Sequence, residues 1–187
     1  MKVIKYSEAE LFSFAFKNAG DKELLEILIK DFGLDVNWRD INFYDTLLYQ
    51  SLKENLDAAK FLISKGACVN ASLGGYPEND NSHGYMSILD AAQGFYTIKE
   101  AGGPSFLKQF GAISFLNLPE EKKQQIIETV DFTKEASDGR NICRSSEQVK
   151  LSVMMAPEKV KQKLIGFINS CDEELIDEAK IDNKNSR

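Results

Sequence analysis

The stretch Gly33-Leu34-Asp35-Val36-Asn37 decides the fold, because it returns 33 positions later as Gly66-Ala67-Cys68-Val69-Asn70. A third copy is reduced to Gly111-Ala112. Apolar stretches at residues 24–29 and 58–63 precede the first two copies, and a further apolar stretch precedes each of these. The order predicts a helix, a turn, a second helix and a Gly-terminated loop. Self-similarity at this period is typical of stacked helical units that bury each other's apolar faces, so the expected fold class is mainly α.

Capping residues indicate where these helices begin and end. Ser7 and Asp21 can cap the two helices of the first unit, and either Asn55 or Asp57 can cap the second helix of the next. Gly33 can take the left-handed conformation that ends a helix, as can its counterpart 33 positions later.

The middle segment, residues 40–71, resembles an ankyrin repeat. Thr46-Leu47-Leu48-Tyr49 stands where that family has Thr-Pro-Leu-His, and the segment ends close to the family's Gly-Ala-Asp-Val-Asn-Ala. A third segment offers Ser87-Ile88-Leu89-Asp90, and Gly102-Gly103-Pro104 interrupts its second helix. The resemblance covers about residues 7–112 and implies an ankyrin-like stack of about three helix-turn-helix repeats.

Three regions are expected along the chain: an ankyrin-like repeat domain (1–112), a C-terminal capping extension (113–170), and an acidic, partly disordered tail (171–187). The extension is predicted to be helical or α+β. A helix should start near Pro119 and another should follow Pro157. Between them, residues 149–155 alternate apolar and polar side chains, which suits a half-buried strand, and a helix over so short a run is the alternative. Because stacking leaves the terminal face of an array bare, we expect the extension to cover the last unit.

The resemblance implies a non-enzymatic protein-recognition module that binds its partner through projecting loops and a concave face. The first loop contains the only Trp of the chain, and Trp, Tyr and Arg are the residue types that dominate binding hot spots. The alternative for Trp38 and Phe43 is packing against the helices. The expected partner-binding residues are Trp38, Arg39, Asn42, Phe43, Tyr44, Tyr76, His83 and Tyr85 on loops, with Tyr49 and Asp90 on first helices.

The net charge and composition of the chain restrict the class of partner that it is expected to bind. A net charge of −6 without a Lys/Arg cluster argues against nucleic acid and favours a protein with a basic surface. No run of about 18 apolar residues predicts a membrane span. The first residues turn acidic before a signal-peptide core develops, which indicates a cytoplasmic protein or one exported without a cleaved signal peptide.

Groups able to hold a metal or cofactor, or to perform catalysis, are scarce. His83 is the sole histidine, so neither a Ser-His-Asp triad nor a His-rich metal site can be assembled. Cys68, Cys143 and Cys171 are odd in number and far apart, which favours free thiols in a reducing compartment. We therefore expect no metal, no cofactor and no enzymatic activity.

Three alternatives stay open from the sequence. The protein could be a dedicated inhibitor, such as an immunity or antitoxin-like protein that covers a basic toxin or enzyme. It could be an exported bacterial effector with ankyrin repeats. It could also carry an enzyme in its C-terminal part, with Cys143 as nucleophile beside Arg140, Asp138 and Glu147, although that set lacks the histidine that usually activates a thiol. Partner identity and oligomeric state are not predicted.

Overall fold

The computed structural model describes residues 2–38, 45–73, 86–129 and 141–175 of the chain. Over these residues the fold is mainly helical, with a small three-stranded sheet and a two-stranded ribbon. The mainly α fold expected from the sequence is confirmed at this level. The elements of the first two units are α1 (Glu8–Phe16), α2 (Lys22–Ile27), a π-helical turn η1 (Leu28–Phe32), α3 (Leu47–Glu54) and α4 (Leu56–Ser64).

The third unit has three short helices in place of two. Its second helix is broken where the sequence predicts, because Gly102 takes a left-handed φ of +82°. The strand pair β2–β3 connects this unit to the second. The elements are β2 (Ser72–Leu73), β3 (Met86–Ser87), α5 (Ile88–Gly94), α6 (Tyr96–Glu100), α7 (Gly103–Gln109) and then α8 (Glu120–Thr129), which begins directly after Pro119 as predicted.

The remaining elements come from the two ends of the chain. The sheet has the order β4-β1-β5, with β1 antiparallel to both neighbours. Its strands are β1 (Lys2–Ser7), β4 (Asn141–Ser145) and β5 (Asp172–Leu175), and the last two helices are α9 (Ser146–Met155) and α10 (Glu158–Ile168).

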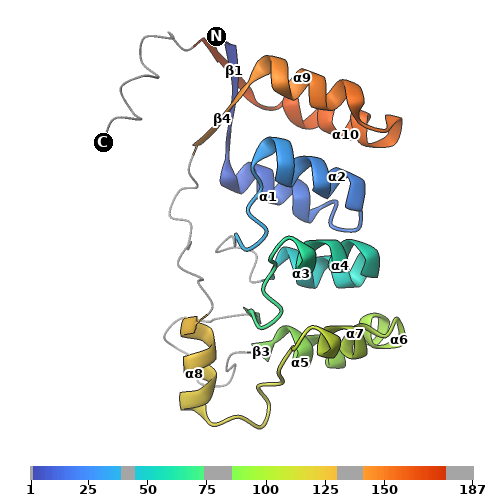
Figure 1. Cartoon of the computed structure of the whole chain (residues 1–187), viewed down its shortest axis with the longest axis vertical. Helices are drawn as coiled ribbons and strands as arrows, with labels where there is room; N and C mark the ends of the chain where they lie inside the picture. The colour runs from blue at the N-terminus through green and yellow to red at the C-terminus, as the bar shows by residue number, and fades with distance from the viewer. Residues whose placement is uncertain (1, 39–44, 74–85, 130–140, 176–187) are drawn as a thin grey trace.

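The paired helices lie in layers. Figure 1 shows α9 with α10, then α1 with α2, then α3 with α4, then α5 with α6 and α7, and neighbouring layers are in contact. The turns between paired helices lie together on the right of Figure 1, and the three-stranded sheet and α8 lie on the left.

Local signals in the sequence produce these helix ends. The Ser7 hydroxyl accepts from the Glu10 backbone N–H at 3.1 Å, and Asp21 accepts from the Leu24 N–H at 3.2 Å. Asn55, rather than Asp57, caps α4 through its side-chain oxygen. Gly33 and Gly66 have φ of +81° and +92° after the second helix of their units, as predicted.

The asparagine that ends the repeated stretch makes the same pair of hydrogen bonds in two successive units. The Asn37 amide donates to the Gly66 carbonyl at 2.9 Å and accepts from the Cys68 N–H at 2.9 Å. The Asn70 amide donates to the Gly111 carbonyl at 3.3 Å and accepts from the Ile113 N–H at 2.9 Å. Each asparagine therefore joins its unit to the loop of the next, which explains why Gly and Asn recur at a fixed spacing.

Two details of the C-terminal part differ from the favoured interpretation of the sequence. Residues 149–155 form the alternative helix, α9, rather than the strand, because the buried Val149 and Val153 are four positions apart and fall on one helical face. Asp172–Leu175, expected in the acidic tail, forms strand β5 beside β1. Helix α10 is confirmed, with Val160, Leu164 and Phe167 buried along its length.

The C-terminal helices also cover the opposite end of the stack from the one predicted. The Phe167 ring stacks on Phe14 with centroids 4.7 Å apart, and Lys163 pairs with Asp21 at 2.8 Å. Helix α10 therefore covers the first unit, whereas the first residues of the extension, 113–115, bond to the second and third units. The physical reason is that Phe167 finds aromatic partners at the first unit, whereas the last unit presents a mixed surface. Its exposed side chains include Thr97, Lys99, Glu100 and Lys108 together with apolar ones such as Tyr96 and Phe110.

Candidate functional site

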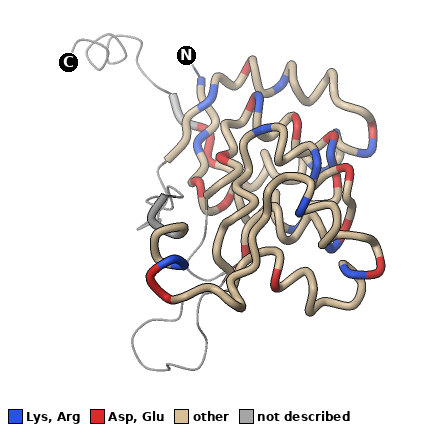
Figure 2. The backbone as a smooth tube through the Cα atoms, turned by 60° about the horizontal axis from the view of Figure 1, so that its bottom comes forward, with Lys and Arg blue, Asp and Glu red and all other residues tan. Residues whose placement is uncertain are grey.

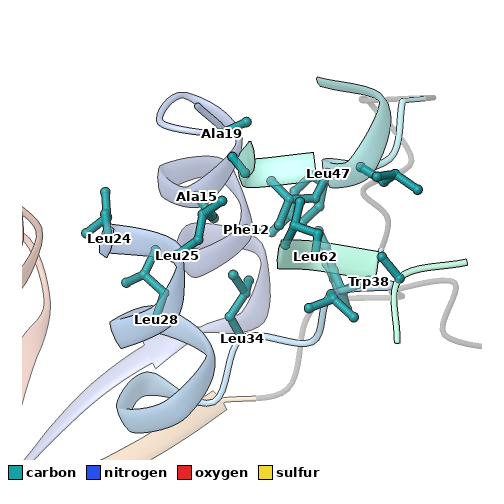
Figure 3. Packing of buried hydrophobic residues seen from close by; sticks show 14 of the residues in the cluster. Phe12, Ala15, Ala19, Leu24, Leu25, Leu28, Leu34, Trp38, Leu47 and Leu62 are labelled. Carbon is teal, nitrogen blue, oxygen red and sulfur yellow. The ribbon is translucent and has the colours of Figure 1, made fainter. Parts of the chain in front are cut away.

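Trp38 is a packing residue, which corrects its expected role in partner binding. Its side chain is 2% exposed, and its ring lies 4.9 Å from that of Phe12. Figure 3 shows it among buried residues of the first two units, including Leu47 and Leu62. The indole Nε1 has no hydrogen-bond partner within the described part of the chain. Of the two interpretations that the sequence left open, packing is the one realised for Trp38.

Tyr49 and Asp90 are also largely buried, each 7% exposed. Asp90 caps α5 with Ser87, accepts from the Phe115 N–H at 2.7 Å and is hydrogen bonded by the Ser114 hydroxyl. Its carboxylate is therefore fully engaged within the third unit, and the expected partner contact is corrected to a structural role. Burial first, and then the Asp45 carboxylate, raise the pKa of Tyr49.

The other predicted partner-binding residues lie outside the described residues. These are Arg39, Asn42, Phe43, Tyr44, Tyr76, His83 and Tyr85. Their roles stay predictions.

An exposed aromatic pair that the sequence analysis missed lies at the turn between α5 and α6. Phe95 is 45% exposed and Tyr96 is 74% exposed. Lys53 on α3 lies beside Phe95, with its Nζ 5.8 Å from the Phe95 ring centroid and 4.3 Å from that of Tyr49. The ammonium also pairs with Asp45 at 2.9 Å. We call Lys53, Phe95 and Tyr96 the aromatic turn patch.

The sequence contains a signal for this patch, although a weak one. Phe95 and Tyr96 follow Gly94 at a helix boundary, where no helical stripe requires two large aromatic residues. Periodicity alone cannot tell whether aromatic residues at such a turn face the core or the solvent.

A cavity of about 540 Å³ lies farther along the same side of the molecule, at the turns of the first two units and the start of α10. Charges of both signs line it, including Lys17, Asp57 and Lys159, together with the Lys163–Asp21 ion pair. Figure 2 likewise shows the two signs interspersed along the described chain rather than gathered in one area. Since Asp21 also caps α2, part of this lining holds the C-terminal helices on the first unit.

The cysteines differ in environment. Cys143 on β4 is exposed, whereas Cys68 and Cys171 are partly buried. Burial, followed by the Glu10 carboxylate, raises the pKa of Cys171 to about 11. Burial also raises the pKa of Cys68 and of the Tyr6 phenol, which donates to the Phe32 carbonyl at 2.7 Å.

Of the residues considered as a catalytic set, Glu147 is exposed on α9, and Asp138 and Arg140 lie outside the described residues. Across the described ranges, no group of three or more His, Cys, Asp or Glu side chains could hold a metal ion. No helix within those ranges is both long and apolar enough to cross a membrane.

Comparison with known protein families, curated proteins and solved structures finds no match for this chain.

Proposed function

We propose that the chain is an ankyrin-like protein-recognition module without enzymatic activity, and that it binds a protein partner through the aromatic turn patch together with its inter-unit loops. The ankyrin-like part of the proposal is supported by the repeated asparagine bonds of Asn37 and Asn70. It is also supported by the left-handed glycines that close the three units, Gly33, Gly66 and Gly111. A stack of such units provides a rigid surface that can bind a partner without rearranging.

The exposure of Phe95 and Tyr96 is the observation that carries the binding proposal. The Phe95 backbone joins α5 to α6, with its N–H donating to Ala91 at 3.0 Å and its carbonyl accepting from Lys99 at 2.9 Å. The backbone alone makes these bonds, so neither aromatic side chain is needed to form the turn. Two large exposed rings, one of them beside the Lys53 ammonium, are the composition expected of a binding hot spot.

The net charge of −6 favours a partner with a basic surface. Binding should then weaken as salt concentration rises, mainly through slower association. The rings supply apolar contact, which salt does not screen.

The experiment replaces Tyr96 by a photo-crosslinking amino acid, with a matched protein carrying the same group at Leu151, an exposed apolar position on α9. Both proteins are irradiated in lysate of the native cell, and cross-linked proteins are identified by mass spectrometry. We expect one species captured from position 96 and not from position 151. With that partner purified, Tyr96→Ala should weaken binding by about tenfold or more while thermal stability is unchanged.

Equal capture from both positions, or unchanged affinity of Tyr96→Ala, would show that the patch is not the binding surface. Phe95→Ala provides a second variant, with the same expected loss of affinity.

A further inference from the structure

The two outer edges of the three-stranded sheet differ in chemistry. Because β1 lies in the middle, β4 and β5 each have one side without a strand neighbour among the described residues. Such an edge presents N–H and C=O groups that can pair with another strand. β5 has the sequence Asp-Glu-Glu-Leu, and closely spaced acids are a common protection against strand pairing. β4 has the sequence Asn-Ile-Cys-Arg-Ser, with one charged residue.

The charged residue of β4 is Arg144, and its side chain points into the molecule. The Arg144 Nε donates to the Asp31 carbonyl at the end of η1, at 3.3 Å. Its guanidinium also lies against Gly33, where a Cβ would collide with it. The exposed Cys143 at the centre of β4 is uncharged, and within the described residues no backbone N–H of β4 donates outside the ladder with β1. This edge therefore lacks the charge protection that β5 has.

We propose that β4 is a self-pairing edge, through which two copies of the chain join antiparallel about a two-fold axis at Cys143. The axis sets Cys143 opposite its counterpart, Ile142 opposite Arg144, and Asn141 opposite Ser145. No two like charges then face each other. The same operation about the centre of β5 would set Glu173 opposite Glu174, and like charges directly opposite are destabilising. Self-pairing therefore opposes no like charges at β4, whereas it does at β5, and for that reason we place the second copy at β4.

The two-fold arrangement is closed, so it makes a dimer and not a fibre. A five-residue edge buries much less than the roughly 1,200–2,000 Å² of a stable interface. We therefore expect the dimer to form only at high protein concentration. It would leave the aromatic turn patch unoccupied, because the patch lies on the opposite side of the stack from the sheet.

The first test is sedimentation of the full chain over a concentration series with dithiothreitol present, so that no disulfide contributes. Wild type should shift from monomer to dimer as concentration rises. Cys143→Lys should stay monomeric with unchanged thermal stability, because pairing would oppose two ammonium groups, whereas Cys143→Val should still dimerise. Leu151→Lys, on the exposed apolar face of α9, is the matched control and should dimerise as wild type does.

Three results would overturn the proposal. They are a wild type that stays monomeric at every concentration, a Cys143→Lys variant that still dimerises, and a dimer lost in Leu151→Lys, which would move the interface to α9.

The second test measures register. In antiparallel pairs, opposite Cα atoms lie about 4.5–5.5 Å apart, within disulfide range. Diamide takes two electrons and two protons from each pair of thiols, so wild type should give a Cys143–Cys143 link. In the Cys143→Ser background, Asn141→Cys mixed with Ser145→Cys should link faster than either alone. Linking through Cys68 or Cys171, or no preference in the mixture, would contradict the two-fold axis.

Discussion

At one end of the stack α10 packs Phe167 against the first unit, whereas at the other end α6 and α7 leave Thr97, Lys99 and Lys108 in solvent. The first end is covered by residues more than a hundred positions away in the sequence. Among the described residues, the last end exposes these polar side chains together with apolar ones such as Tyr96 and Phe110. The two ends of the layered helices are therefore completed differently within the described residues. A distant segment buries the apolar face of the first unit, whereas the last unit leaves charged and apolar side chains together in solvent.

The largest expected loss of stability comes from removing the aromatic ring of Phe167, which packs α10 against the first unit. Phe167 is 6% exposed and its ring lies 4.7–6.0 Å from those of Tyr6, Phe14 and Phe32. Phe167→Ala should lower the free energy of unfolding by about 3–5 kcal/mol, measured by urea denaturation. The matched variant at the other end is Phe110→Ala, at a position 38% exposed, which should cost about 1 kcal/mol. Equal losses would mean that the two ends do not differ as described.

Gly33 and Gly66 offer a sharper comparison, because both have positive φ but only Gly33 touches the C-terminal segment. A Cβ at Gly33 meets the Arg144 guanidinium, whereas a Cβ at Gly66 meets nothing within 4 Å. Gly66→Ala should cost about 1–2 kcal/mol of backbone strain. Gly33→Ala should cost about 3 kcal/mol, because the Arg144 bond to Asp31 is lost as well.

In an Arg144→Ala background the two glycine substitutions should cost the same, as measured by a double-mutant cycle in urea. A cost at Gly33 that stays larger without Arg144 would show that the clash has another source.

The asparagines that end the repeated stretch test how the units are joined. Asn37→Ala and Asn70→Ala each remove two hydrogen bonds to the next unit, at a cost of about 1–2 kcal/mol. Hydrogen exchange should then speed up in different places. Asn70→Ala should loosen the third unit alone, whereas Asn37→Ala should affect both units beside it. Identical exchange patterns would contradict a unit-by-unit arrangement.

The smallest effect is a pH dependence at the covered end. The pKa of Cys171 is about 11 in the folded protein, against about 8.5 for a free thiol. Folding therefore favours the protonated thiol, and this contribution to stability is complete below about pH 8.5 and is lost as pH rises through 11. Cys171→Ala should show a flatter stability profile than wild type over that interval. An unchanged profile would show that the Cys171 thiol is not shielded.

The ends of individual helices could be predicted from the sequence, whereas the packing of distant segments against each other could not. Ser7, Asp21 and Gly33 act within a few residues, so their caps and stops follow from residue type alone. Over residues 149–155 the sequence leaves strand and helix open, because so short a run fits both and the exposed Met154 and Met155 add apolar character on the solvent side. The pairing of β1 with β4 and β5 depends on contacts between opposite ends of the chain, which no local pattern contains.

For the candidate site, the sequence predicts the type of residue but not which residues form it. The sequence indicates aromatic residues at loops and turns, but it places weight on Trp38, which the fold buries, and passes over Phe95 and Tyr96, which the fold exposes. Burial of an aromatic side chain depends on which helices lie beside it, and that is decided by packing between units.

Carbodiimide cross-linking tests the layered arrangement most directly, because it joins a carboxylate to an amine in direct contact. Lys163 Nζ lies 2.8 Å from Asp21 Oδ2, although the residues are 142 positions apart. Mass spectrometry of the digested wild-type chain should find a Lys163–Asp21 link, and Asp21→Asn should abolish it. A link from Lys163 to a carboxylate of the last unit, such as Glu100, would contradict the account.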